Sequence, residues 1–117
     1  GEVWTVDDWQ RCRAVSGCAN VMIGRGAVAD PFLALRIKGA ADARPSLDDW
    51  HALVPHSVDY WQKVRRRTFA ANASGRLKLL LSHFRRTWPE AVALHAAVRP
   101  LRDSADVARV LAEAGAR

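Results

Sequence analysis

The chain has 117 residues, half of them apolar, and a net charge of +6. This length allows one domain with a small core and part of another. It contains no run of about 18 apolar residues and no charged segment followed by an apolar stretch, so we expect neither a membrane span nor a signal peptide. Its two cysteines, Cys12 and Cys18, do not make a disulfide framework, and the cysteines and histidines do not have the spacing of a zinc site. This favours reduced thiols in a cytoplasmic protein without a metal.

The first part of the chain is expected to alternate between strands and a helix. Gly1–Trp4 is typical of the end of a strand, and Thr5 can cap a helix from Val6 to Ser16 that stops at Gly17. Asn20–Ile23 is apolar on both faces, as in a parallel strand covered on both sides. The order strand, helix, strand predicts the last β-α-β piece of a larger parallel fold.

A second helix is expected soon after this piece. Asp30 is a good N-cap with Pro31 at the first helical position, and the helix should extend to about Lys38. The segment 39–45 is rich in small residues and reads as a linker, so a domain boundary is expected there.

The remainder of the chain, 46–117, is expected to be a small antiparallel helical bundle. Ser46 should cap a long helix that continues to about Ala71, with a kink or a split at Pro55. Gly75 should separate it from the next helix. Further helices are expected at Arg76–Thr87, from Pro89 onward, and from the cap Ser104 to the stop Gly115. The whole chain is therefore expected to be mainly α.

Positive charge is concentrated in the stretch 61–102. It holds ten basic residues and a single acid, so it carries +9 and the rest of the chain −3. The basic residues are Lys63, Arg65, Arg66, Arg67, Arg76, Lys78, Arg85, Arg86, Arg99 and Arg102. An excess of this size indicates an anionic partner, and the planar arginine fork suits phosphate oxygens and stacked bases. Leu77, Leu80, Leu81 and Phe84 have the spacing of a buried helical stripe, which the charges should flank.

The segment Gly24-Arg25-Gly26 follows directly after an apolar stretch. Glycine lets the backbone approach a ligand closely, and free amides beside a cation make an anion site. A plain tight turn with a solvated Arg25 is an equally open interpretation from the residues alone.

The stretch GEVWTVDDWQRCRAVSGCANVMIGRGAVADPFL resembles the end of the catalytic barrel of the bacterial tRNA-dihydrouridine synthases. In that family an Asn-Gly-Glu segment ends the penultimate strand, and Gly1 and Glu2 match its last two members. A Gly-Cys pair matches Gly17-Cys18, and Val-Met-Ile-Gly-Arg-Gly-Ala on the last strand matches Val21–Ala27.

The resemblance continues into the helical part of the chain. GRLKLLLSHFRRTWPEAVALHAAVRPLRDSADVARVL is similar to the C-terminal helical domain of the family, where Arg-x-Lys-x-x-x-Ser-aromatic marks the helix that contacts tRNA. Arg76 and Lys78 match this pattern, and His83 stands where the family often has an aromatic. The similarity is strongest to the subgroup that acts on uridine 16.

The resemblance implies an enzyme that reduces a D-loop uridine of tRNA, by analogy uridine 16, to dihydrouridine, with FMN as cofactor and NADPH as reductant. It implies an edge of the FMN phosphate site at Gly1, Glu2, Gly24 and Arg25. It implies tRNA contacts at Arg76, Lys78, His83 and Arg99. Residues 1–38 would be the end of a TIM (β/α)8 barrel, 39–45 a linker and 46–117 the tRNA-binding domain.

The resemblance also implies what this chain would not do alone. The catalytic cysteine of the family matches a position before Gly1, so neither Cys12 nor Cys18 is assigned to catalysis. As a C-terminal fragment, the isolated chain is expected to be inactive and not to retain FMN. Its orphaned barrel strands are expected to favour self-association.

Two other functions remain open from the residues themselves. The chain could be a stand-alone basic helical module that binds RNA or DNA without catalysis. It could also be a helical adaptor whose basic face meets an acidic protein or lipid headgroups. Specific binding of tRNA, as against equal binding of any polyanion, would separate an RNA-directed role from the adaptor.

Overall fold

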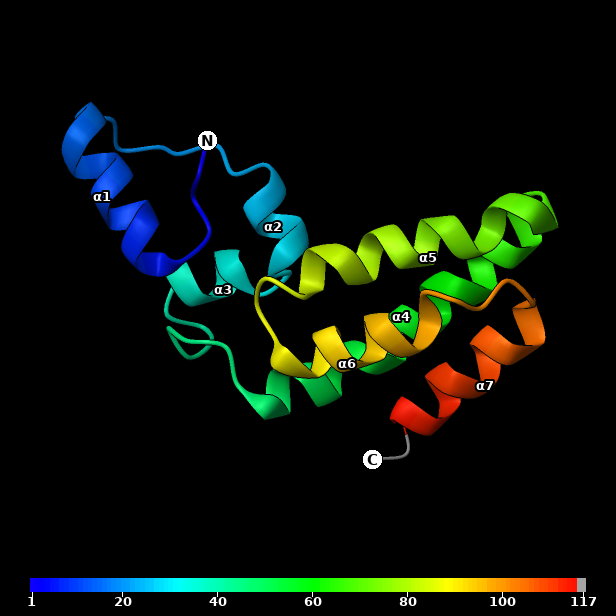
Figure 1. Ribbon diagram of the computed structural model, residues 1–117. Helices are drawn as coiled ribbons and strands as arrows, with labels where there is room; N and C mark the ends of the chain where they lie inside the picture. Colours follow the sequence, from blue (N-terminus) through cyan, green and yellow to red (C-terminus); the bar gives the residue numbers. More distant parts are fainter. Residues whose placement is uncertain (116–117) are drawn as a thin grey trace. The chain divides into compact units, whose positions relative to one another are not determined.

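The computed structural model describes residues 1–115, apart from the side chains of Ala70 and Ala71. The chain divides into two compact units, Gly1–Pro45 and Ser46–Arg117. Every regular element in the described range is a helix (Figure 1). The expectation of a mainly α chain is confirmed, whereas the two strands expected before residue 24 do not form. None of the helices in residues 1–115 has the length and apolar character needed to cross a membrane.

The prediction of a β-α-β piece is therefore wrong for the described chain. Gly1–Trp4 and Asn20–Ile23 adopt no strand structure, and Met22 is 95% exposed. A parallel strand is held by hydrogen bonds from neighbouring strands on both sides, and neither segment forms such a ladder within residues 1–115. Self-association through strand edges is not tested by this structure and stays a prediction, because the two strands that would supply the edges are absent from residues 1–115.

The first long helix, α1 (Val6–Ser16), has the predicted bounds. The Thr5 side chain accepts a hydrogen bond from the Asp8 amide, and the Asp8 carboxylate accepts one from the Thr5 amide in return. The Trp4 amide also donates to Asp8 at 2.9 Å, and this bond lowers the pKa of the Asp8 carboxyl. Gly17 ends the helix with φ 71, in the left-handed region that glycine adopts easily.

A short helix, α2 (Arg25–Ala29), begins inside the Gly-Arg-Gly segment. A side-chain carbon at Gly26 would overlap the carbonyl group of Val3, whereas one at Gly24 would meet open space. The second glycine is thus required because two backbone segments touch. Gly24 is not required by any such contact within the unit, and the open space beside it could hold another group.

The helix expected from Pro31 starts later, as α3 (Leu33–Ile37). The Asp30 carboxylate accepts a hydrogen bond from the Phe32 amide at 3.1 Å, just before the helix begins. It also accepts two hydrogen bonds from Arg36. Arg36 Nε lies 2.8 Å from the Asp30 carboxylate, and both side chains are at least 97% buried. Arg36 also donates to the carbonyls of Asp42 and Arg44, so the segment after α3 is tied back to it.

The second unit is a four-helix bundle of α4 (Leu47–Arg67), α5 (Ala70–Phe84), α6 (Pro89–Val98) and α7 (Ser104–Gly115). Both α4 and α6 pack against α5 and α7 (Figure 1). The core includes three of the four residues of the expected α5 stripe, all but the half-buried Leu80, and three tryptophans. Its members include Trp50, Leu53, Val54, Trp61, Val64, Leu77, Leu81, Phe84, Trp88, Leu94, Val98, Val107 and Leu111.

The break between the first two bundle helices differs from the prediction. Pro55 lies inside a continuous α4, and Gly75 lies inside α5. The chain turns instead at Thr68 and Phe69, whose ring is 84% exposed. Glycine in a helix costs only about 1 kcal/mol relative to alanine, which the burial of Leu77 and Leu81 in the same helix outweighs.

The remaining helix starts are close to the prediction, whereas α5 ends at Phe84, three residues before the predicted Thr87. Ser46 caps α4 and Pro89 begins α6. At α7 the capping side chain is Asp103, one residue before the expected Ser104, and it accepts the Ala105 amide at 2.7 Å. The indole nitrogen of Trp88 donates to the Ser46 carbonyl at 3.1 Å, which fixes the start of α6 against the start of α4.

Candidate functional site

A hollow of about 230 Å³ lies in the first unit, where the chain start meets the Gly-Arg-Gly segment. It is lined by Gly1, Glu2, Val3, Trp4, Met22, Gly24, Arg25 and Gly26. The four residues that the sequence assigns to a cofactor phosphate are all among them. Two segments that are about twenty residues apart in the sequence are thus brought together, even though neither forms a strand.

Glu2 is the centre of the polar contacts in this hollow. Its carboxylate lies 3.6 Å from the Arg25 guanidinium and accepts the Trp4 indole N–H at 2.8 Å. The guanidinium also lies over the Trp4 ring, 5.4 Å from its centroid. Glu2 has φ 64, a left-handed conformation that a glutamate rarely adopts, and such strain is often found at functional positions.

The chemistry of this hollow fits one end of a phosphorylated ligand. Arg25 is exposed, and an exposed ion pair such as that with Glu2 is worth only about 0–1 kcal/mol, so the guanidinium can turn to a phosphate at little cost. Gly24 leaves open space beside the backbone. The Glu2 carboxylate can accept hydroxyl groups, such as those of a sugar-like chain. Within residues 1–115, no three His, Cys, Asp or Glu side chains are placed to hold a metal ion.

A basic cluster lies in the second unit, where α5 and α6 pack together. We call it the His95 cluster: Lys78 on α5 with Arg85 directly after that helix, and His95 on α6 with Arg99 directly after that helix. Burial lowers the pKa of His95, and the charges of Arg85, Arg99 and Lys78 lower it further. Among the described residues, every charge that shifts this pKa is positive. The Lys78 ammonium is anchored by donating to the Leu101 carbonyl at 2.7 Å.

The structure brings together only two of the four residues predicted to contact tRNA. Lys78 and Arg99 belong to the His95 cluster. Arg76 and His83 are seven positions apart and share another face of α5. Arg76 lies about 200° around the helix from Lys78. Arg76 is exposed and His83 half-buried. The predicted residues therefore lie on both flanks of the buried stripe.

Sequence reasoning left Arg85 and His95 out of the predicted site. Their spacing was a usable signal, because Lys78 and Arg85 are seven apart on one helix and His95 and Arg99 four apart on the next. Each pair shares a helix face. The sequence does not say that these two faces meet, since that depends on the angle at which the helices pack.

The depressed pKa of His95 predicts a dependence of stability on pH. Unfolded His95 titrates near 6.5, whereas the folded residue holds its proton less tightly. The unfolded chain therefore binds more protons as the pH falls through about 6.5, and the free energy of unfolding should fall with it. We expect a lower urea midpoint at pH 5.5 than at pH 7.5, and a smaller difference in His95→Gln. An equal difference in both proteins would contradict this role of His95.

Comparison with known proteins shows the family to which the chain belongs. Residues 1–114 match the family model described as dihydrouridine synthase. A protein of Cupriavidus necator named tRNA-dihydrouridine(16) synthase is 55% identical over 111 residues, which cover 95% of this chain and 34% of that protein. One of Ralstonia nicotianae with the same name is 55% identical over the whole chain, covering 36% of its own length.

A more distant relative has the same printed name. The tRNA-dihydrouridine(16) synthase of Escherichia coli K12 is 34% identical over 111 residues, covering 95% of this chain and 34% of that protein. The chain thus spans about a third of the length of the curated relatives it matches.

Proposed function

Because the chain belongs to the dihydrouridine synthase family, we propose that it forms part of a tRNA-dihydrouridine synthase that acts on uridine 16 of the D-loop. Enzymes of this family are FMN-dependent oxidoreductases, and NADPH is the proposed reductant. In this proposal the second unit binds tRNA and the first unit supplies one edge of the FMN phosphate site.

The His95 cluster is the observation that carries the tRNA-binding part of the proposal. The charges of Lys78, Arg85 and Arg99 all lower the pKa of one half-buried imidazole, and a bound phosphate group would relieve the repulsion among them. Lys78 is held in place by the Leu101 carbonyl, so part of the site is already ordered before a ligand arrives. Arg85 and Arg99 can each present two N–H groups to phosphate oxygens.

Arg76 and His83 would act separately from this cluster. They lie on the other flank of α5, where Arg76 makes no ion pair among the described residues. A folded RNA presents phosphates over a wide surface, so contacts on two faces of one helical unit suit recognition by shape. Both residues remain proposed tRNA contacts.

In the first unit, Arg25 and the backbone near Gly24 would hold the FMN phosphate, while Gly1 and Glu2 would lie near the phosphate or the hydroxylated chain beside it. The support is the open space at Gly24, the exposed guanidinium, and the carboxylate that can accept hydroxyl groups. When bound, FMN supplies the hydride that reduces the uridine ring. The residues of this chain would bind and orient one end of the cofactor.

A salt titration of tRNA binding tests the proposed interface. Arg85→Ala and Arg99→Ala should each weaken binding of unmodified tRNA by tenfold or more, because a charge-assisted hydrogen bond is worth about 1.5–3 kcal/mol. Each lost phosphate contact should also flatten the plot of log affinity against log salt by about 0.7–0.9. Arg76→Ala and Lys78→Ala should show the same signature if they too contact phosphates.

Arg109→Ala is the matched control for this titration. Arg109 is an exposed arginine on α7 that pairs with Asp106 and Glu113. Its replacement by alanine therefore removes one positive charge, as the test variants do, but at a position outside the His95 cluster. Wild-type affinity and slope in both Arg85→Ala and Arg99→Ala would exclude the His95 cluster as the tRNA surface. Equal affinity of the wild-type chain for tRNA and for heparin would favour the adaptor function instead.

A further inference from the structure

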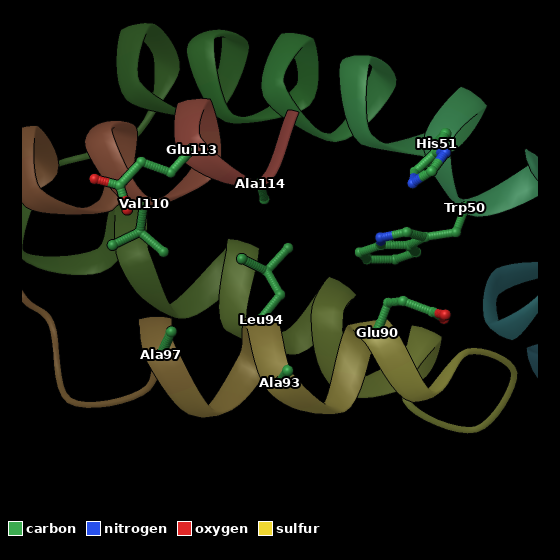
Figure 2. Close-up of a pocket in the computed structure, with 9 residues that line it drawn as sticks. All are labelled: Trp50, His51, Glu90, Ala93, Leu94, Ala97, Val110, Glu113 and Ala114. Carbon is green, nitrogen blue, oxygen red and sulfur yellow. The ribbon is translucent and has the colours of Figure 1, made fainter. Parts of the chain in front are cut away.

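A second cavity, of about 300 Å³, lies in the bundle between α4, α6 and α7 (Figure 2). Its walls are mostly small and apolar side chains, among them Ala97 and Leu94 of α6 and Val110 of α7. A volume of this size is at the lower end of ligand pockets, so it suits a small molecule. The tRNA and flavin contacts proposed above involve none of its residues.

Trp50 presents a polar group to this cavity. Its side chain is 5% exposed, and Figure 2 shows the indole extending from α4 into the pocket with the ring nitrogen on the cavity side. The ring packs against Trp88, with 6.1 Å between centroids. Within residues 1–115 the indole N–H has no hydrogen-bond acceptor. In residues 1–115 the fully buried side-chain nitrogen without a partner is that of Trp61, so the Trp50 nitrogen reaches the water of the cavity. It can donate to a ligand oxygen there.

The cavity also has acidic ends. Glu90 and Glu113 both line it, and in Figure 2 their carboxylates lie at opposite ends of the apolar wall. Glu113 is paired with Arg109 at 3.5 Å, whereas Glu90 has no ion pair among the described residues. Glu90 is also the only acid between residues 61 and 102. Carboxylates at both ends disfavour a phosphate and favour a cation.

We propose that this cavity binds a small organic amine that has an apolar body and a hydroxyl or carbonyl oxygen next to the amine. The ammonium group faces Glu90, and the neighbouring oxygen accepts the Trp50 indole N–H. The apolar body packs on Leu94 and Ala97. An anion would meet both carboxylates, and a plain hydrocarbon would leave Glu90 and Trp50 without a new partner.

Leucinol is a suitable probe because it combines an ammonium group, an adjacent hydroxyl and a branched apolar body. We expect it to produce a saturable shift of the Trp50 indole signal in proton–nitrogen NMR spectra of the 117-residue chain. Trp50→Phe assigns that signal by its loss. N-acetyl-leucinol, which lacks the charge, and 4-methylpentanoate, which reverses it, should bind at least tenfold more weakly.

Two variants and one control test the assigned residues. Glu90→Gln should weaken leucinol binding at least tenfold, and Ala97→Phe, at an exposed position of α6, should fill the cavity and abolish binding. Asp59→Asn is the control, because it removes an exposed carboxylate from α4 outside the cavity. Circular dichroism checks that each variant is folded.

Three results would overturn the proposal: no saturable shift with leucinol, equal binding of leucinol and 4-methylpentanoate, or wild-type binding by folded Glu90→Gln and Ala97→Phe. None of them bears on the tRNA salt titration, which involves other residues. The two proposals therefore fail independently.

Discussion

Arg36→Ala is expected to unfold much of the first unit, because it leaves the Asp30 carboxylate buried without its partner. Removing one member of a buried ion pair costs about 3–5 kcal/mol. The Arg36 and Asp30 side chains are only 1% and 3% exposed. The change also releases the carbonyls of Asp42 and Arg44, so the segment after α3 loses its tie to that helix.

Amide hydrogen exchange measures this effect in each unit separately. In Arg36→Ala the amides of α1 and α3 should exchange much faster, while those of α4 keep their protection. Arg44→Ala is the control, since Arg44 offers Arg36 only its backbone carbonyl, which alanine retains. Unchanged protection of α3 in Arg36→Ala would mean that the buried pair contributes little to stability.

Leu81→Ala should be the most informative change in the bundle. Leu81 is fully buried on α5, and truncating a buried leucine to alanine costs about 2–5 kcal/mol. Leu79 lies two residues away on the same helix and is 61% exposed. The same substitution there should change the free energy of unfolding by no more than about 0.5 kcal/mol.

Urea unfolding followed by tryptophan fluorescence measures both variants, since Trp50, Trp61 and Trp88 all lie in this core. Because the two changes have the same chemistry and the same helix propensity, their difference reports burial alone. Similar losses in both variants would contradict the packing of α5.

The helices that could be predicted from sequence are those with clear local end signals. Thr5 with Asp8 and Ser46 with Asp49 form reciprocal caps that fix the starts of α1 and α4. Pro89 likewise marks the first residue of α6. The stripe on α5 was predictable from its spacing, and three of its four members are nearly or fully buried.

The features that sequence reasoning missed depend on distant contacts. The expected strands at Gly1–Trp4 and Asn20–Ile23 need neighbours to pair with, and none pairs with them in residues 1–115. Gly75 reads as a helix stop, but the packing of Leu77 and Leu81 carries the helix through it. The need for Gly26 appears only once the Val3 carbonyl is seen against it.

The candidate sites were predictable to different degrees. Gly1, Glu2, Gly24 and Arg25 were assigned through a family resemblance, and they line one hollow. Their role in holding FMN stays a prediction. The charge of the stretch 61–102 and its place on the two flanks of the buried α5 stripe were visible in the sequence. The sequence did not show that Lys78 and Arg85 lie near His95 and Arg99. The cavity beside Trp50 left no sequence signal, because its walls come from three helices whose packing the sequence does not specify.

The placement of α7 has a consequence for synthesis of the chain on the ribosome. Val107 and Leu111 are fully buried, and α7 packs against α4, the first helix of the bundle (Figure 1). At roughly 5–20 residues per second, the 12 residues of α7 take about 0.6–2.4 seconds to be made after α4 to α6. Until then the nascent bundle exposes the apolar surface that α7 will cover. A chain that ends just before Ser104 should therefore bind chaperones after its release, and the chain that includes α7 should not.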